Sequence, residues 1–400
     1  MSMPMVIHDL QDSQMFALAQ AAGRAGIPVI GTSWPMEPWV KKSRYIQKAV
    51  ELPCLGEVVN GVYAMNLKKS GLQGVWLPCV DDMAEFTAEY APLLRNIGMR
   101  FLSADQETVR RAITTHELQP QGIIRMPDCE VISMQELYDE KCGCAFPVVI
   151  KTRRNGFVRF DDAGALRKFL QPMIEAGHGE QMEIVQSYIA GETERMASAI
   201  VLFDDNGRPV RGFTGRRQRV AQTHHGPFGE TTAAKAEWIP ELYAGACELL
   251  SHLGWKGFAE VECKQDANGE WQLLEINPRL SGWTCLAEAD GAGFLQAYYR
   301  MCAEDAQLDE ACLQRSRAEY TRIIGTCYHD PDWDADASRC HGLWRKISMI
   351  TAALRRYRDR ALDASLGAWD GRDLHASLTL LWRSIVRVWK IGRVRHKGVA

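Results

Sequence analysis

The sequence predicts three units: an α/β unit over residues 1–100, an α+β unit over residues 101–310, and a mostly helical extension over residues 311–400. Three observations predict this division. Strand and helix patterns alternate in the first unit, β-rich runs joined by Asn-Gly turns dominate the second, and tryptophan-containing amphipathic stretches fill the third. The length of 400 residues also exceeds the usual size of one domain.

The first unit is predicted to hold a parallel sheet. In chain order its elements are a strand at residues 4–8, a helix at 13–25, strands at 27–31 and 74–78, and a helix around 83–97. Gly26 is expected to end the first helix, because glycine readily adopts the left-handed conformation found there. Strands that alternate with helices of this length indicate parallel pairing. No G-x-G-x-x-G follows the first strand, which disfavours dinucleotide binding.

The second unit is richer in strands, which favours an α+β arrangement. Its predicted elements are strands at residues 146–151 and 183–189, a hairpin of 196–203 and 209–214, a helix at 240–253, and a hairpin of 258–265 and 270–277. Each hairpin contains an Asn-Gly pair, a strong turn signal. In the third unit, residues 344–360 and 373–389 are predicted helices, and residues 315–345 are predicted connections.

Composition describes an ordinary globular protein, with 46% hydrophobic and 24% charged residues. The net charge of −3 argues against a nucleic-acid binder whose whole surface is basic, so no nucleic-acid partner is expected. The first residues lack the cationic segment of a signal peptide. No apolar run approaches the roughly 18 residues that span a bilayer.

The spacing of the cysteines matches no disulfide framework. Twelve of them are scattered along the chain, which indicates free thiols in a reducing compartment, so we expect a cytoplasmic protein. Cys142 and Cys144 form a C-x-C pair. No second pair stands at zinc-ligand spacing, which disfavours a metal site there.

The most informative stretch is residues 257–282. Side chains alternate along a strand, so Glu260 and Glu262 point to one side of it. Across the hairpin, Glu275 and Asn277 also share a face, and Glu262, Glu275 and Asn277 are expected to converge. Carboxylate and amide oxygens are the hard ligands that magnesium takes while keeping water and substrate phosphates. Arg279 follows closely and suits bidentate binding of a phosphate or carboxylate.

A solvated polar face on an edge hairpin is the alternative interpretation. We favour metal and phosphate binding, because Leu273, Leu274 and Ile276 surround the charged positions with apolar ones. A purely solvated face would not be enclosed in this way.

The pattern E-V-E…L-L-E-I-N-P-R-L-S-G resembles the signature of the ATP-grasp superfamily, in particular its carboxylate–amine ligases. The resemblance covers roughly residues 1–310 and is strong over 146–293. It implies a Rossmann-like first unit, an ATP-grasp second unit and a helical C-terminal extension. It also implies that Glu262, Glu275 and Asn277 bind one or two Mg²⁺ (or Mn²⁺) ions, and that Arg279 stabilises an acyl phosphate.

The resemblance places ATP as well. The residues it implies in nucleotide binding are Arg111, Lys151, Gln186, Ser187, Ile189, Glu192 and Glu194. Lys151 ends a predicted strand, where the family keeps a lysine that reaches the phosphates. Gln186 opens the hinge that would hold adenine, although a glutamate is common there. Either Glu192 or Glu194 would hold the ribose, and the spacing leaves both open.

Two other positions remain open alternatives. Arg111 stands where the family often has a lysine, counted back from Gly122, and a surface helix arginine would look the same. Arg216 or Arg217 would bind the acceptor carboxylate or the γ-phosphate, and Arg216 is taken as the catalytic candidate. His224 and His225 have the side chain suited to proton transfer near neutral pH, although paired histidines in a polar loop are more often only solvated.

The implied reaction joins a small-molecule carboxylate to an amine, with an amino acid expected as one of the two. The carboxylate attacks the γ-phosphate of ATP, and the amine then displaces phosphate from the acyl phosphate. The alternatives are a carboxylation or carbamoyl-phosphate type of reaction and an ATP-binding module without turnover. A homodimer is compatible with the resemblance.

The end of the chain is basic. After Asp373 no acidic residue occurs, and the cationic residues are Arg383, Arg387, Lys390, Arg393, Arg395 and Lys397. With Trp382 and Trp389 they allow peripheral contact with an anionic membrane surface. We favour the alternative, a helix whose tryptophans pack on the ATP-binding unit.

Overall fold

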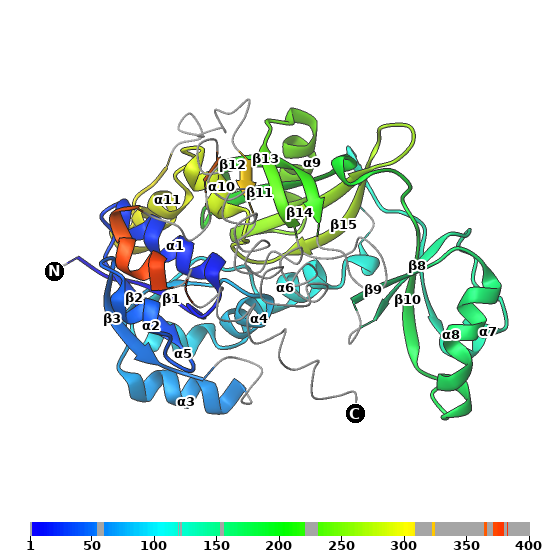
Figure 1. Cartoon of the computed structure of the whole chain (residues 1–400), viewed down its shortest axis with the longest axis horizontal. Helices are drawn as coiled ribbons and strands as arrows, with labels where there is room; N and C mark the ends of the chain where they lie inside the picture. Colours follow the sequence, from blue (N-terminus) through cyan, green and yellow to red (C-terminus); the bar gives the residue numbers. More distant parts are fainter. Residues whose placement is uncertain are drawn as a thin grey trace, which may run out of the picture.

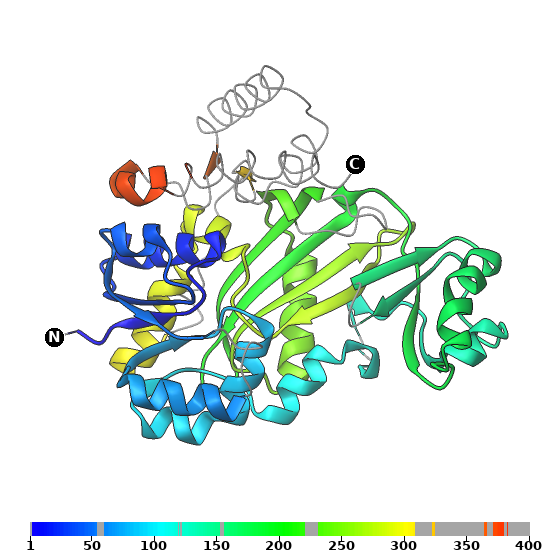
Figure 2. The same ribbon diagram turned by 60° about the horizontal axis from the view of Figure 1, so that its bottom comes forward.

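The structure is a computed structural model that describes residues 2–53, 60–118, 120, 122–152, 156–220, 231–308, 322–324, 364–365, 371–379 and 382. Within these residues the strands form sheets of five, four and eight strands. Figure 1 shows the five-stranded sheet at one end of the molecule, the four-stranded sheet at the other, and the eight-stranded sheet between them; Figure 2 shows the same order.

The five-stranded sheet is parallel, with the order β3-β2-β1-β4-β5. Its strands are β1 (Met5–Ile7), β2 (Val29–Ser33), β3 (Ile46–Glu51), β4 (Gly74–Leu77) and β5 (Met99–Arg100). The accompanying helices are α1 (Ser13–Arg24), α2 (Pro38–Lys42), α3 (Asn60–Ser70), α4 (Asp81–Glu89) and α5 (Ala91–Asn96). The predicted parallel sheet is confirmed. Strand β3 was missed because it is a half-exposed edge strand without an apolar run.

The four-stranded sheet is antiparallel, with the order β7-β10-β8-β9. Its strands are β7 (Cys129–Ser133), β8 (Val148–Thr152), β9 (Gly156–Phe160) and β10 (Met182–Ser187). Helices α7 (Met134–Tyr138) and α8 (Ala163–Glu175) pack on one face through a core that includes Ile132, Ile150 and Val185. Both views show these helices on the side away from the eight-stranded sheet. The other face leaves Val131 and Met182 about half exposed.

The eight-stranded sheet has the order β17-β16-β13-β12-β11-β14-β15-β6. Its strands are β6 (Ile124–Arg125), β11 (Met196–Phe203), β12 (Pro209–Val220), β13 (Thr231–Ala236), β14 (Gly257–Gln265), β15 (Trp271–Asn277), β16 (Arg322–Ile324) and β17 (Ala364–Ser365). Both predicted hairpins are confirmed. Strand β11 pairs with β12 and with β14, so the two hairpins lie side by side in one sheet.

The two faces of this sheet differ. On one face, helix α9 (Pro240–His252) covers alternate side chains of β11 and β14, among them Ala199 and Val261. On the other face, Ile200 and Phe258 pack with helices α10 (Thr284–Ala289) and α11 (Phe294–Glu304) and with the first unit. The hydrophobic core covers only part of this second face. Glu262 and Glu275 lie on the remaining, polar part.

The C-terminal segment departs from the sequence prediction in two ways. Strands β16 and β17 belong to the central sheet: β16 lies where a connection was expected, and β17 lies between the two predicted helices of a unit expected to be mostly helical. Residues 374–379 are helical as predicted, but they pack on the first unit rather than on the ATP-binding unit, and Trp382 is 67% exposed. The segment 344–360, Trp389 and the basic positions from Arg383 onward lie outside the described residues. No helix among the described residues is long and apolar enough to cross a bilayer.

A buried aspartate attaches this segment. Asp373 accepts hydrogen bonds from Gln20 Nε2 at 3.0 Å, from Ser43 Oγ at 2.5 Å and from the Arg44 backbone N–H at 2.9 Å. Its partners come from α1 and from the end of α2, more than three hundred residues earlier in the chain. The contact therefore holds the two ends of the described chain together.

The Asp373→Asn variant is expected to lose about 2–4 kcal/mol of unfolding free energy, because its amide keeps one acceptor oxygen but replaces the other by a donor that faces a hydrogen-bond donor with little access to water. Urea unfolding measures the loss, and limited proteolysis measures release of the segment. Asp205→Asn, at an exposed ion pair with Lys256, serves as the control. Equal stability of the two variants would contradict the anchoring role.

Candidate active site

The register of the β14–β15 hairpin brings four polar side chains together. Glu260 pairs with Asn277 across the hairpin, and Glu262 pairs with Glu275. The Asn277 amide donates to Glu275 Oε1 at 3.1 Å and to Glu260 Oε2 at 3.3 Å. The predicted convergence of Glu262, Glu275 and Asn277 is therefore present, and the structure adds Glu260, which is almost fully buried.

Two arginines contact this acidic cluster. Arg217 of β12 forms an ion pair with Glu262. Arg279, just after β15, donates through Nη2 to Asn277 Oδ1 at 3.1 Å. Its Nε donates to Asp81 at the start of α4, at 2.7 Å. Arg279 thus lies between the cluster and the carboxyl edge of the five-stranded sheet.

The electrostatics of the cluster favour a cation. Burial raises the pKa of Glu262 to about 7, against the opposing effect of Arg217. Burial, reinforced by the charge of Glu262, raises the pKa of Glu275 to about 7 as well. Burial also raises the pKa of Glu260, whose Oε1 has no hydrogen-bond partner among the described residues. Two buried carboxylates, a third that is partly buried and the amide oxygen of Asn277 are a donor set that fits Mg²⁺.

The raised pKa of Glu275 predicts a pH-dependent stability difference between wild type and Glu275→Gln in magnesium-free buffer. The folded state holds this proton more tightly than the unfolded state, so wild-type stability falls as pH rises from about 4.5 to about 7. Glutamine does not titrate, so the variant should gain up to about 3 kcal/mol on the wild type between pH 5 and pH 8. Urea unfolding at both pH values measures the gain. A constant difference would show that Glu275 is not a buried acid.

Lys151 joins the small sheet to this cluster. It lies in β8, and its Nζ donates to the Leu274 carbonyl oxygen of β15 at 2.9 Å. Burial lowers the pKa of Lys151, and the charge of neighbouring Glu275 opposes that shift. A partly desolvated ammonium at this position can neutralise a phosphate brought beside the cluster. The sequence places Asn155–Gly156 after Lys151 as a candidate loop to cover the phosphates, and Asn155 lies outside the described residues.

The hinge after β10 contains the predicted adenine and ribose positions. Gln186 is buried in β10, opposite Cys129 and Val149 in the two neighbouring strands. The Ser187 backbone N–H already donates to Asp128 O at 2.8 Å. That group is therefore engaged within the sheet. Ile189, also predicted at the hinge, is buried.

The two predicted ribose positions, Glu192 and Glu194, have different surroundings. Glu192 lies within electrostatic reach of Lys264, which is on the same face of β14 as Glu262. The backbone carbonyl of Glu194 instead accepts from Arg216 at 2.9 Å, on the α9 side. Lys264 was missed by sequence reasoning, and strand alternation from Glu262 would have revealed it.

Arg216 does not lie with the cluster. Its Nε donates to Glu237 at 2.9 Å, and its guanidinium lies over the Trp271 ring. It lines a cavity of about 640 Å³ on the α9 side of the sheet. Neighbouring residues of a strand face opposite ways, so Arg217 has the position that the sequence analysis gave to Arg216. This corrects the choice between the two.

The remaining predicted residues gain no support from the structure. Arg111 is exposed on α6 (Gln106–Ile113), and among the described residues it has no hydrogen bond or ion pair with the cluster. The position of Arg111 was inferred from its spacing to Gly122. Gly122 lies against Glu248 of α9, on the face of the central sheet opposite the acidic cluster. His224 and His225 lie outside the described residues.

No family model and no curated protein matches the sequence. Among solved structures, an L-amino acid ligase from Bacillus licheniformis is similar over 77% of this chain and 78% of its own, with a TM-score of 0.57 and 18% identity. Phosphoribosylamine–glycine ligase from Thermotoga maritima is similar over 78% and 77%, with a TM-score of 0.53 and 16% identity.

A third similar structure is the biotin carboxylase domain of the Hydrogenobacter thermophilus 2-oxoglutarate carboxylase, in complex with MgADP and bicarbonate. It covers 77% of this chain and 71% of its own, with a TM-score of 0.58 and 13% identity. The chain therefore has the ATP-grasp fold, as the β14–β15 motif predicted.

Proposed function

We propose that this chain with the ATP-grasp fold is an ATP-dependent ligase that forms an amide from a carboxylate and an amine through an acyl phosphate. One observation carries the proposal. Glu262, Glu275 and Asn277 share a buried face with Arg217, and Lys151 reaches that face from the opposing sheet. Buried acids, an amide oxygen and cations in one place suit the transfer of a phosphoryl group.

The nucleotide would lie between the small sheet and the central sheet. The uncovered face of the small sheet offers Val131 as an apolar contact for a base, with Gln186 as the polar one. Lys151 would contact the phosphates, and Glu192 the ribose. Glu262, Glu275 and Asn277 would hold Mg²⁺ (or Mn²⁺), whose charge neutralises phosphate oxygens when it is bound.

The reaction divides into two displacements. A carboxylate oxygen bonds to the γ-phosphorus as the bond to the ADP oxygen breaks, and Arg217 and Arg279 are positioned to stabilise the charge of the transferring group. The amine nitrogen then bonds to the acyl carbon as the phosphate leaves, and the nitrogen loses a proton. Amide, ADP and phosphate are the products.

The carboxylate and the amine would be held at the carboxyl edge of the five-stranded sheet, where open parallel sheets bind ligands. This edge adjoins the cluster. The Leu280 N–H donates to Pro78 O just after β4, at 3.2 Å, and Asp81 holds Arg279. The similarity to an L-amino acid ligase supports an amino acid as one substrate.

The test is ADP release with pooled carboxylates and amines, followed by mass spectrometry of the products. A product whose mass equals acid plus amine minus water supports the proposal. The similarity to a biotin carboxylase domain favours bicarbonate as the competing substrate. ADP release that needs bicarbonate, or ATP binding without turnover under every condition, would replace the proposal with a carboxylation-type reaction or a binding module.

A further inference from the structure

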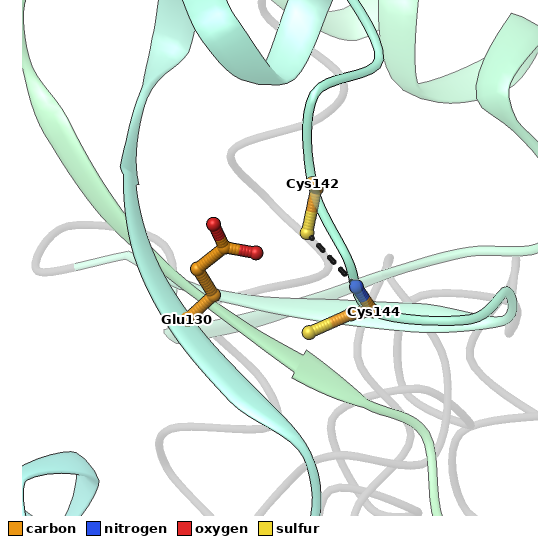
Figure 3. Close-up of side chains that lie close together, drawn as sticks. All are labelled: Glu130, Cys142 and Cys144. Atoms are coloured by element: carbon orange, nitrogen blue, oxygen red, sulfur yellow. Dashed lines mark hydrogen bonds between the residues drawn. The ribbon is translucent and has the colours of Figure 1, made fainter.

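A second group of potential metal ligands lies in the small unit. Glu130 of β7 faces the loop that carries Cys142 and Cys144, and Figure 3 shows the three side chains converging. One ligand atom from each, a carboxylate oxygen and two sulfurs, lies within 4.8 Å of the others. The C-x-C alone was weak evidence for a metal, but the tertiary structure adds a third ligand from another segment.

Backbone groups already orient the carboxylate and one of the sulfurs. The Gly143 N–H donates to Glu130 Oε2 at 2.9 Å. The Cys144 N–H donates to Cys142 Sγ at 3.4 Å, the dashed line of Figure 3. Hydrogen bonds that hold a ligating carboxylate or thiolate are typical of metal sites, because they fix the direction of its lone pairs.

The charges of the cluster also point to a cation. Among the described residues, Glu130 forms no ion pair with a lysine or arginine, and its neighbours here are thiols that become anionic when they lose a proton. The structure therefore brings together three groups that repel one another when charged, and no cationic side chain among the described residues pairs with the carboxylate.

We propose that Glu130, Cys142 and Cys144 bind a thiophilic divalent cation, Zn²⁺ by preference, with a water molecule as the fourth ligand. Two thiolates and a carboxylate are a zinc donor set, and sulfur ligands disfavour Mg²⁺. Tetrahedral Zn–S bonds of about 2.3 Å would place the sulfurs about 3.8 Å apart, so side-chain shifts of about 1 Å close the site. Each thiol loses its proton to the solvent on binding.

Such an ion would connect β7 to the loop that leads into β8, the strand that carries Lys151. Glu130 and Cys142 are only partly buried, so the ion can enter from solvent. The Cys144 thiol donates to Asp128 O at 3.7 Å and to Val185 O at 3.8 Å, and it gives up these hydrogen bonds when it loses its proton to bind the ion. It thereby also approaches the backbone of β10. Binding is therefore expected to stiffen the edge of the small sheet.

The test uses Co²⁺ as a spectroscopic replacement for Zn²⁺ in the reduced full-length protein. The wild type should show a sulfur-to-cobalt charge-transfer band that saturates at one equivalent of sulfur-bound Co²⁺, with proton release that makes the binding enthalpy depend on the buffer. An oxygen site such as the β14–β15 cluster gives no such band. The double variant Cys142→Ser/Cys144→Ser should lose the band, and Glu130→Gln should weaken Co²⁺ binding roughly tenfold or more.

Cys247→Ser, which removes a thiol of α9, is the matched control and should bind Co²⁺ as the wild type does. Circular dichroism checks that each variant folds, and Zn²⁺ should raise the melting temperature of the wild type but not of the double variant. Absence of the band in the reduced wild type, or its persistence in the double variant, would overturn the proposal. A Cys142–Cys144 disulfide in air with no metal binding after reduction would also overturn it.

Discussion

Replacing Glu275 with glutamine is expected to abolish substrate-stimulated ADP release, with a loss of roughly a thousandfold or more. Glutamine keeps the shape of the side chain and an oxygen that can accept from Asn277, so the fold should survive. It removes one negative charge from the proposed Mg²⁺ ligands, at the point where Lys151 approaches from the other sheet. The measurement is coupled ADP release at saturating ATP and Mg²⁺.

The control is Glu270→Gln, one residue before β15, whose carboxylate pairs with Arg125 away from the cluster. This variant should retain turnover within a few-fold of the wild type. Full ligation by Glu275→Gln would refute the assignment of the site. Loss of activity in both variants together with a lowered melting temperature would point to a damaged hairpin instead.

Replacement by methionine is expected to lower kcat strongly at Arg217 but only slightly at Arg216. Arg217→Met removes the cation paired with Glu262 inside the cluster and is expected to lower kcat roughly a hundredfold or more. Arg216→Met removes an ion pair to Glu237 on the α9 side and should leave kcat within a few-fold. Its expected cost is about 1–2 kcal/mol of stability, from a half-buried ion pair.

Steady-state kinetics of the two variants, with urea unfolding of each, separates catalysis from stability. Arg217→Lys keeps the charge and should recover part of the lost kcat, which a merely structural role would not require. A large loss of kcat in Arg216→Met, with normal activity in Arg217→Met, would reverse the correction made by the structure. The acceptor would then have to bind on the α9 side.

Several features of the molecule follow from local pattern. The β14–β15 hairpin is marked by its Asn-Gly turn and by alternating apolar and acidic positions, so the shared face of Glu262 and Glu275 could be predicted. The parallel pairing of the first sheet followed from its strand–helix alternation. Strand β3 and the two-residue strand β17 could not be predicted, because edge strands lack an apolar pattern and depend on the neighbours that they pair with.

The sequence by itself determined which residue types meet at the acidic cluster. Side chains alternate along each strand, and the two strands belong to one hairpin, so their shared face depends only on local sequence. Only the tertiary structure decided which of Arg216 and Arg217 faces that cluster, because the register of β12 depends on β11 and β13 and shifts after Arg217. It also decided that Lys151 reaches Leu274 and that Glu130 joins Cys142 and Cys144. Those contacts link segments whose proximity depends on the folding of the whole chain.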